Sequence, residues 1–107
     1  MAHAHMTMLA LAEKLPTLAA EDIVLDVRGR DEYGAGHVLG SMNIPHDEIL
    51  QHVSELRQYG HLYIYCKSGG RSGFVSDLLS NMGLTNLTCI SGSGMPDWVA
   101  AGLPVAK

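Results

Sequence analysis

Short apolar runs recur along this 107-residue chain, and segments with helical spacing separate them. The runs are Ile23–Val27 (IVLDV), Leu62–Tyr65 (LYIY), Asn86–Ile90 (NLTCI) and a weaker candidate, Ser41–Pro45 (SMNIP). Short apolar, β-branched runs are typical of strands that are buried on both faces. Because parallel strands need helical crossovers, the alternation predicts one α/β domain with a mainly parallel sheet and helices on both faces.

Three segments carry apolar residues at the spacing of amphipathic helices. They are Met8, Leu11, Ala12 and Leu15, ending at Pro16; Ile49, Leu50, Val53 and Leu56, ending by Gly60; and Val75, Leu78, Leu79 and Met82. Gly83 is expected as the left-handed cap of the third segment. Pro96 suits the first turn of a short final helix, Met95–Ala101. Residues 29–40 are expected to form a loop with one helical turn.

Charge and cysteine content exclude several classes of protein. Seven Lys and Arg against eleven Asp and Glu give a net charge of -4, which argues against a nucleic-acid or anionic-membrane binder. No apolar run approaches the roughly 18 residues of a membrane helix. Two cysteines, Cys66 and Cys89, do not make a disulfide framework. A reducing compartment is therefore expected, and we predict a cytoplasmic protein.

The first six residues, MAHAHM, contain His3 and His5 as an H-x-H pair. Such a pair could contact a metal, but we expect a frayed terminus or the remnant of an expression tag. The predicted domain accordingly spans residues 7–107, and residues 1–6 are expected to be disordered.

The segment Cys66–Ser72 (CKSGGRS) follows a predicted strand and precedes a predicted helix. Ligands of open α/β sheets bind beyond the carboxyl ends of the strands, where Cys66 is expected. Gly69 and Gly70 can take dihedral angles that are closed to other residues, so this turn can point several N–H groups inward as an anion-binding nest.

Three further features of this loop favour an ionised thiol. The helix beginning near Ser72 contributes its positive N-terminal dipole, and Arg71 contributes a full charge with a planar fork of donors. Such settings lower the pKa of a cysteine from about 8.5 to roughly 3.5–7.5. Since the thiolate is the nucleophile, Cys66 is predicted to attack or carry a group from an anionic substrate, which Lys67 would attract.

The same loop resembles the active-site loop of single-domain rhodaneses, which are sulfurtransferases. Three other segments agree with this family in order and spacing: Leu25–Pro45, Ser91–Trp98 (SGSGMPDW) and Ala101–Val105 (AGLPV). The resemblance covers about residues 22–105. Ser93 stands where the family often has glycine, Leu39 stands where proline is common, and the short strand that usually opens the fold is not evident.

The resemblance implies a three-layer α/β/α domain with about five short strands. It also implies that the Cys66 thiolate takes the outer sulfur of a donor such as thiosulfate and passes it to cyanide or to a thiol, which can belong to a protein. No metal and no organic cofactor are expected. The loop residues that would bind the donor are Lys67, Ser68, Gly69, Gly70, Arg71 and Ser72.

Other residues have a structural as well as a functional interpretation. Asp26 and Arg28 are expected to form an ion pair that anchors a loop, and by resemblance they help to shape the floor of the site. His37 could meet substrate, but a hydrogen-bonded structural histidine is favoured. Ser72 is expected to donate to the Cys66 sulfur, to cap the following helix, or both. Structural roles are expected for Glu32 (paired with a cation) and for Tyr63, Tyr65, Cys89 and Trp98 (packed in the interior).

Two other functions remain open. A cysteine phosphatase or arsenate reductase uses the same thiolate and nest, but typically has one residue more between cysteine and arginine than Lys67–Gly70 provides. A non-catalytic binding module is the second alternative. Members of the family that lose activity often lose the cysteine, whereas Cys66 is present here with its complete loop.

Overall fold

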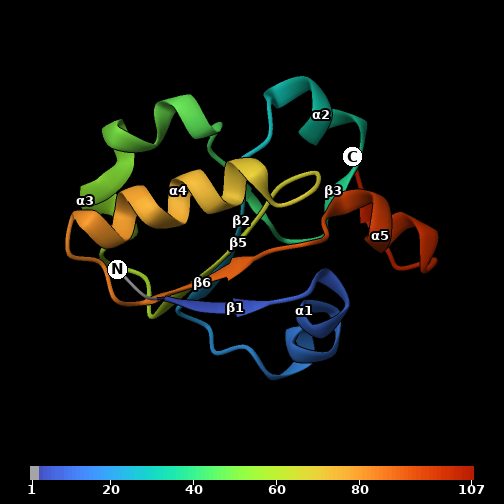
Figure 1. Ribbon diagram of the computed structural model, residues 1–107. Coiled ribbons are helices and arrows are strands. Elements are labelled where there is room, and N and C mark those ends of the chain that lie inside the picture. Colours follow the sequence, from blue (N-terminus) through green and yellow to red (C-terminus); the bar gives the residue numbers. More distant parts are fainter. Residues whose placement is uncertain (1–2) are drawn as a thin grey trace.

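A central sheet of five parallel strands runs through the computed structural model, which describes residues 3–107 (Figure 1). Its spatial order is β1-β6-β5-β2-β4. The strands are β1 (Ala4–Met6), β2 (Asp22–Asp26), β4 (Met42–Asn43), β5 (His61–Tyr65) and β6 (Leu87–Ile90). Every neighbouring pair is parallel, so the carboxyl ends of all five strands lie at one edge. The predicted parallel sheet is confirmed.

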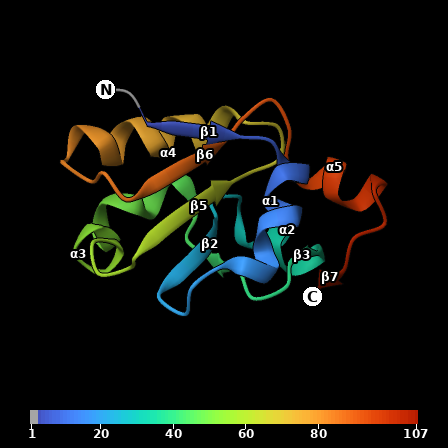
Figure 2. The ribbon, with the colours of Figure 1, turned by 90° about the horizontal axis from the view of Figure 1, so that it is seen from below.

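Helices cover both faces of this sheet, as Figures 1 and 2 show. On one face lie α4 (Gly70–Asn81), α3 (Val53–Leu56) and the 3-10 helix η2 (His46–His52). On the other face lie α1 (Met8–Lys14), which continues as the short η1 (Leu15–Thr17), and α5 (Met95–Ala100). The three-layer architecture expected from the sequence is therefore confirmed. No helix of the described residues is long and apolar enough to cross a membrane.

A second, small element lies beyond the carboxyl ends of the strands. There α2 (Arg30–Ala35) leads into β3 (His37–Val38), which pairs antiparallel with β7 (Val105–Ala106). This pairing brings residues near the end of the sequence beside α2, next to the edge of the sheet that binds ligands in such folds.

The alternation of side chains along β5 divides the interior into two cores. Leu62 and Ile64 pack under α3 and α4, whereas Tyr63 and Tyr65 pack under α1 and α5 with Trp98. All five are buried, as predicted for the two tyrosines and the tryptophan. Burying one such side chain contributes about 1.5–3 kcal/mol, so these two cores hold the ends of β5 firmly in place.

The amino-terminal residues differ from the sequence expectation. Instead of a frayed segment, Ala4–Met6 form β1 at the edge of the sheet, with His5 opposite Cys89 and Met6 opposite Ile90. A run of three residues has no measurable period, and it is the free edge of β6 that supplies its hydrogen-bonding partner. The expectation for residues 1 and 2 lies outside the described residues.

The predicted amphipathic helix around residues 49–56 is also different in detail. Its first half is the 3-10 helix η2, and Leu50, expected in the interior, is 62% exposed. A 3-10 helix has about 3.0 residues per turn, so the period of about 3.6 residues on which the prediction rests does not apply to this segment. The other helices lie close to their predicted bounds, and Gly83 has a left-handed φ of 92°, as expected of a helix cap.

Candidate active site

Cys66 is the first residue after β5, at the carboxyl edge of the sheet, and only 1% of it is exposed. Its Sγ accepts hydrogen bonds from the backbone N–H of Gly69, at 3.1 Å, and of Ser72, at 3.3 Å. The protonated thiol donates to Ser72 Oγ, 3.5 Å away, whereas the thiolate accepts from this hydroxyl. The backbone therefore wraps around the sulfur, as a nest wraps around an anion.

Two glycines allow the loop to take this shape. Gly69 is the N-cap of α4 and has a left-handed φ of 111°, which a residue with a Cβ rarely adopts. Gly94 lies so close beneath the loop that a Cβ there would collide with the carbonyl oxygens of Cys66 and Lys67. The N–H of Met95 donates to the Cys66 carbonyl at 3.0 Å, which fixes the loop to the start of α5.

Opposing effects act on the pKa of the Cys66 thiol. Burial raises this pKa, but hydrogen bonds from the Ser72 hydroxyl and from the N–H groups of Ser72, Gly69 and Ser68 outweigh burial. The net result is a pKa below the ordinary value of a cysteine, so the site favours the thiolate.

Ser72 has one of the two roles expected from the sequence. Its side chain contacts the Cys66 sulfur, and its Oγ also lies 2.7 Å from the Ile90 carbonyl oxygen and 3.1 Å from that of Gly69. It does not cap the helix, because Gly69 holds the N-cap position and Ser72 is already inside α4. The buried hydroxyl therefore links the sulfur to β6.

The Arg71 guanidinium binds the carboxylate of Glu32. Its two terminal nitrogens donate to the two oxygens of Glu32, at 2.6 and 2.9 Å, so α4 is tied to α2. Hydrogen bonds from Arg71 lower the pKa of Glu32 to about 2, against an opposing effect of partial burial. The expected cation partner of Glu32 is thus confirmed as Arg71. Through this contact Arg71 holds the loop against α2.

Asp26 and Arg28 form a buried ion pair at the end of β2, as expected. Arg28 donates from Nε, from Nη2 at 2.7 Å and from its own backbone N–H to the Asp26 carboxylate. Nη2 also donates to the Gly36 carbonyl oxygen at 2.7 Å, and the guanidinium lies 5.8 Å from the centre of the Tyr65 ring. This pair anchors the loop that leads into α2.

His37 has the structural role that the sequence favoured. Its ring stacks on Tyr33 at 3.6 Å between centroids, and Nδ1 lies 2.7 Å from the Tyr33 carbonyl oxygen. It lies in β3, and it is not among the residues that line the cavity beside the loop.

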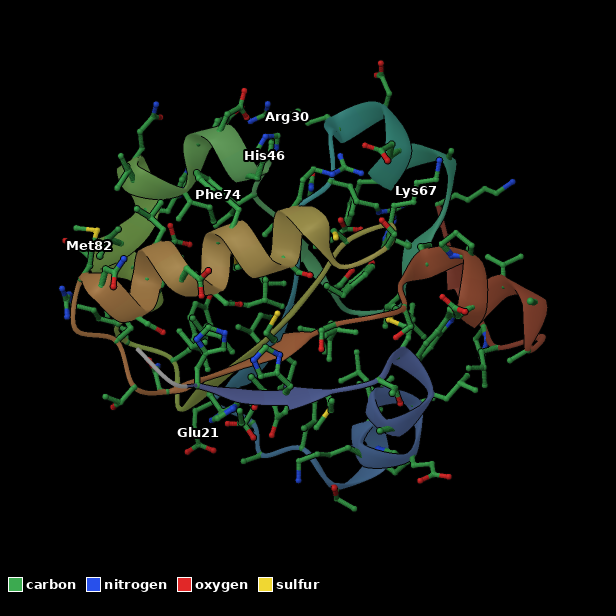
Figure 3. All side chains as sticks on the ribbon, in the orientation of Figure 1. Glu21, Arg30, His46, Lys67, Phe74 and Met82 are labelled. Atoms are coloured by element: carbon green, nitrogen blue, oxygen red, sulfur yellow. The ribbon has the colours of Figure 1, made fainter. Side chains whose placement is uncertain are left out.

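An open cavity of about 750 Å³ lies beside the loop, between α2, α5 and the carboxyl-terminal residues. Arg28, Lys67 and Lys107 contribute cations to its lining, and Met95, Val99 and Val105 contribute apolar surface. Figure 3 shows Lys67 near α2, at the turn between β5 and α4. Lys67 is exposed and lines this cavity, whereas the Arg71 guanidinium is engaged by Glu32.

Sequence reasoning missed the apolar wall of this cavity. Val99 and Val105 are 56% and 41% exposed although both side chains are apolar. The exposure of Val99 had one signal in the sequence. Val99 directly follows Trp98, the expected core residue of this helix, and two consecutive helical residues do not face the same core.

Comparison with known proteins agrees with this geometry. The model of the rhodanese-like domain family matches residues 9–101. The thiosulfate sulfurtransferase PspE of Escherichia coli is 36% identical over 81 residues, which are 74% of this chain and 77% of PspE. The uncharacterized protein YqhL of Bacillus subtilis is 35% identical over 75 residues, which are 70% of this chain but 59% of YqhL.

Among solved structures, a rhodanese-related protein from Thermoplasma volcanium superposes with a TM-score of 0.81. It is 28% identical, and the match covers 97% of this chain and 98% of that one. The family match over most of the chain, the PspE similarity and the shared fold lead to one conclusion: this chain belongs to the rhodanese-like domain family.

Proposed function

We propose that this protein is a sulfurtransferase that moves a sulfane sulfur from thiosulfate, or from a persulfide donor, through a persulfide on Cys66. The observation that carries the proposal is the pair of backbone N–H groups, from Gly69 and Ser72, that donate to the Cys66 sulfur. They favour the thiolate before the reaction, and the same loop can hold the charge of the persulfide after it.

In the first step the Cys66 thiolate attacks the outer sulfur of thiosulfate. A bond forms between the two sulfurs, the bond from the outer sulfur to the sulfonate sulfur breaks, and its electron pair leaves with sulfite. Lys67 lies beside the cavity and attracts the dianionic donor. The reaction consumes and releases no proton when the thiolate is already formed.

In the second step an acceptor attacks the terminal sulfur of the persulfide. The sulfur–sulfur bond breaks and Cys66 leaves as the thiolate, which its hydrogen bonds make a better leaving group. Cyanide gives thiocyanate, and a thiolate gives a new persulfide. The exchange thus proceeds in two stages through a covalent intermediate on the protein.

Relatives support sulfur donors and acceptors as partners. PspE is described as a thiosulfate sulfurtransferase, and YrkF of Bacillus subtilis, 33% identical over 75 residues, is described as a putative sulfur carrier protein. The chain spans 59% of YqhL and 40% of YrkF, so the acceptor is proposed here only as a small or protein-borne thiol. The two free, buried thiols support a reducing compartment, and we keep the cytoplasm as the proposed location.

Steady-state formation of thiocyanate and sulfite from thiosulfate and cyanide tests the proposal. We expect turnover by the wild type and by Cys89→Ser, and none by Cys66→Ser. Hydrolysis of an aryl phosphate is measured on the same samples, because the phosphatase alternative uses the same kind of loop. Release of phosphate that is faster than formation of thiocyanate would overturn the proposal.

A further inference from the structure

The second cysteine, Cys89, lies beside two histidines. It is in the middle of β6 and is fully buried, and its Sγ lies 3.8 Å from the Ile90 carbonyl oxygen, which is a weak contact. Strand β1 runs beside it in parallel register, with His5 directly opposite Cys89. His3 directly precedes β1, and the centroid of its ring lies 4.8 Å from that of His5.

The potential metal-binding atoms of these three residues converge. One atom from each of His3, His5 and Cys89 lies within 4.8 Å of the other two. Tetrahedral zinc with bonds of about 2.0–2.3 Å places its ligand atoms roughly 3.5 Å apart, so the cluster is slightly wider than a closed site. His5 is exposed on an edge strand, and rotation of its side chain can close this difference.

Each histidine also has a polar partner for its other ring nitrogen. His3 Nδ1 lies 3.1 Å from Ser80 Oγ, and His5 Nδ1 lies 3.2 Å from Ser91 Oγ. When these Nδ1–H groups donate to the serines, the lone pairs are on the Nε2 atoms. Metal-binding histidines are generally oriented in this way by a second hydrogen bond.

A fourth ligand is within reach on α4. Asp77 Oδ1 lies 3.9 Å from His3 Nε2, which is close to the separation of two ligands of one zinc ion. The Asp77 side chain is 71% exposed, so it can turn toward an ion without losing a buried contact. A water molecule could occupy the same position.

We propose that His3, His5 and Cys89 bind one Zn²⁺ ion, and that Asp77 or a water molecule completes a tetrahedron. Two imidazoles and one thiolate form a ligand set of the softness that zinc prefers. Binding transfers the thiol proton of Cys89 to solvent as the sulfur–zinc bond forms, and no electron is transferred. The ion ties β1 to β6 and to the helix above them, at a site separate from Cys66.

Zn²⁺ binding is measured on the full chain by titration against a chromophoric chelator. The protein is first reduced and freed of metal. We expect one ion per chain for the wild type and for Cys66→Ser, and an affinity at least about 100-fold lower for His5→Gln. His52→Gln is the matched control, because His52 is a partly exposed histidine whose recorded partner, Glu55, lies outside the cluster. Equal affinity of His5→Gln and wild type would overturn the proposal.

Spectroscopy with Co²⁺ in place of Zn²⁺ identifies the thiolate. A sulfur-to-cobalt charge-transfer band is expected in the wild type and in Cys66→Ser, and its absence is expected in Cys89→Ser. Because Cys89→Ser alters a buried position, its fold is checked by circular dichroism, and His3→Gln provides a second variant that should weaken the band. A band that depends on Cys66, or binding of Cu⁺ with no binding of Zn²⁺, would contradict the proposed zinc site.

Discussion

Arg71 and Glu32 form a two-point ion pair that joins the first turn of α4 to α2, with N–O distances of 2.6 and 2.9 Å. Arg71 directly precedes Ser72, whose N–H and hydroxyl contact the Cys66 sulfur. The pair therefore sets the position of the loop that surrounds the thiolate. A change on either side of the pair is expected to act on the chemistry through the loop.

Arg71→Lys is expected to lower sulfur transfer about 10- to 100-fold, because lysine keeps the charge but cannot bind both oxygens of Glu32. Glu32→Gln should give a similar loss. The double variant should be little worse than either single one, since both remove the same contact. The measurement is kcat/KM for thiosulfate, together with circular dichroism to show that the fold is retained.

Arg30→Lys is the matched control for these variants. Arg30 also forms a two-point pair, with Glu48, but its side chain is 67% exposed and lies outside the loop. We expect it to leave sulfur transfer within about twofold of the wild type, because solvent screens an exposed ion pair and the pair does not contact the loop. Equal losses in Arg30→Lys and Arg71→Lys would contradict the bracing role of Arg71.

The Arg71–Glu32 ion pair should persist in acid. The pKa of Glu32 in the folded protein is about 2, against an ordinary value of 4.5, so the pair's contribution to stability is complete above about pH 4.5. That contribution is lost as the pH falls toward 2. We expect the carboxyl carbon of Glu32, followed by NMR, to titrate near pH 2 in the wild type and closer to 4.5 in Arg71→Lys. A wild-type midpoint near 4.5 would contradict the pairing.

Cys66 should react with an alkylating agent at a lower pH than an ordinary thiol. Burial raises its pKa, and the Ser72 hydroxyl and three backbone N–H groups lower it by more. Ser72→Ala removes one of these donors, so the midpoint of the rate against pH should rise. Cys89, which lies inside β6 between β1 and β5 and outside the loop, should react only after unfolding and serves as the internal control. A wild-type midpoint at or above that of a free thiol would exclude the stabilised thiolate.

Lys67→Ala should weaken the capture of thiosulfate more than the chemical step. Lys67 is exposed beside the cavity, so its charge acts on an approaching dianion and is screened by salt. A severalfold rise in KM with little change in kcat is expected, and the difference from wild type should shrink at high ionic strength. Lys14→Ala, on α1, is the control for loss of a surface charge. Identical KM values for all three proteins would remove Lys67 from the site.

Much of the site was predictable because its signals are local in the sequence. The loop around Cys66 is one continuous segment, in which Gly69 supplies the left-handed turn that points N–H groups at the sulfur. The partner of Arg71 was not predictable in this way, because Glu32 is 39 residues away and only the packing of α2 beside α4 brings them together.

The strand at the edge of the sheet, β1, could not be predicted from the sequence for a different reason. Strand β1 is three residues long, and its stability depends on the backbone of β6 and not on any pattern of its own. The contact between His5 and Cys89 follows from that pairing, so it could not be read from residues 84 positions apart. Strands β2, β5 and β6 were predictable because continuous apolar runs report burial on both faces.

The mass of the intact protein after treatment with thiosulfate is the most direct test of sulfur transfer through Cys66. The wild type and Cys89→Ser are predicted to gain the mass of one sulfur atom and to lose it when cyanide is added. Cys66→Ser is predicted to gain nothing. A wild type that gains no sulfur, or an adduct that persists in Cys66→Ser, would contradict the account.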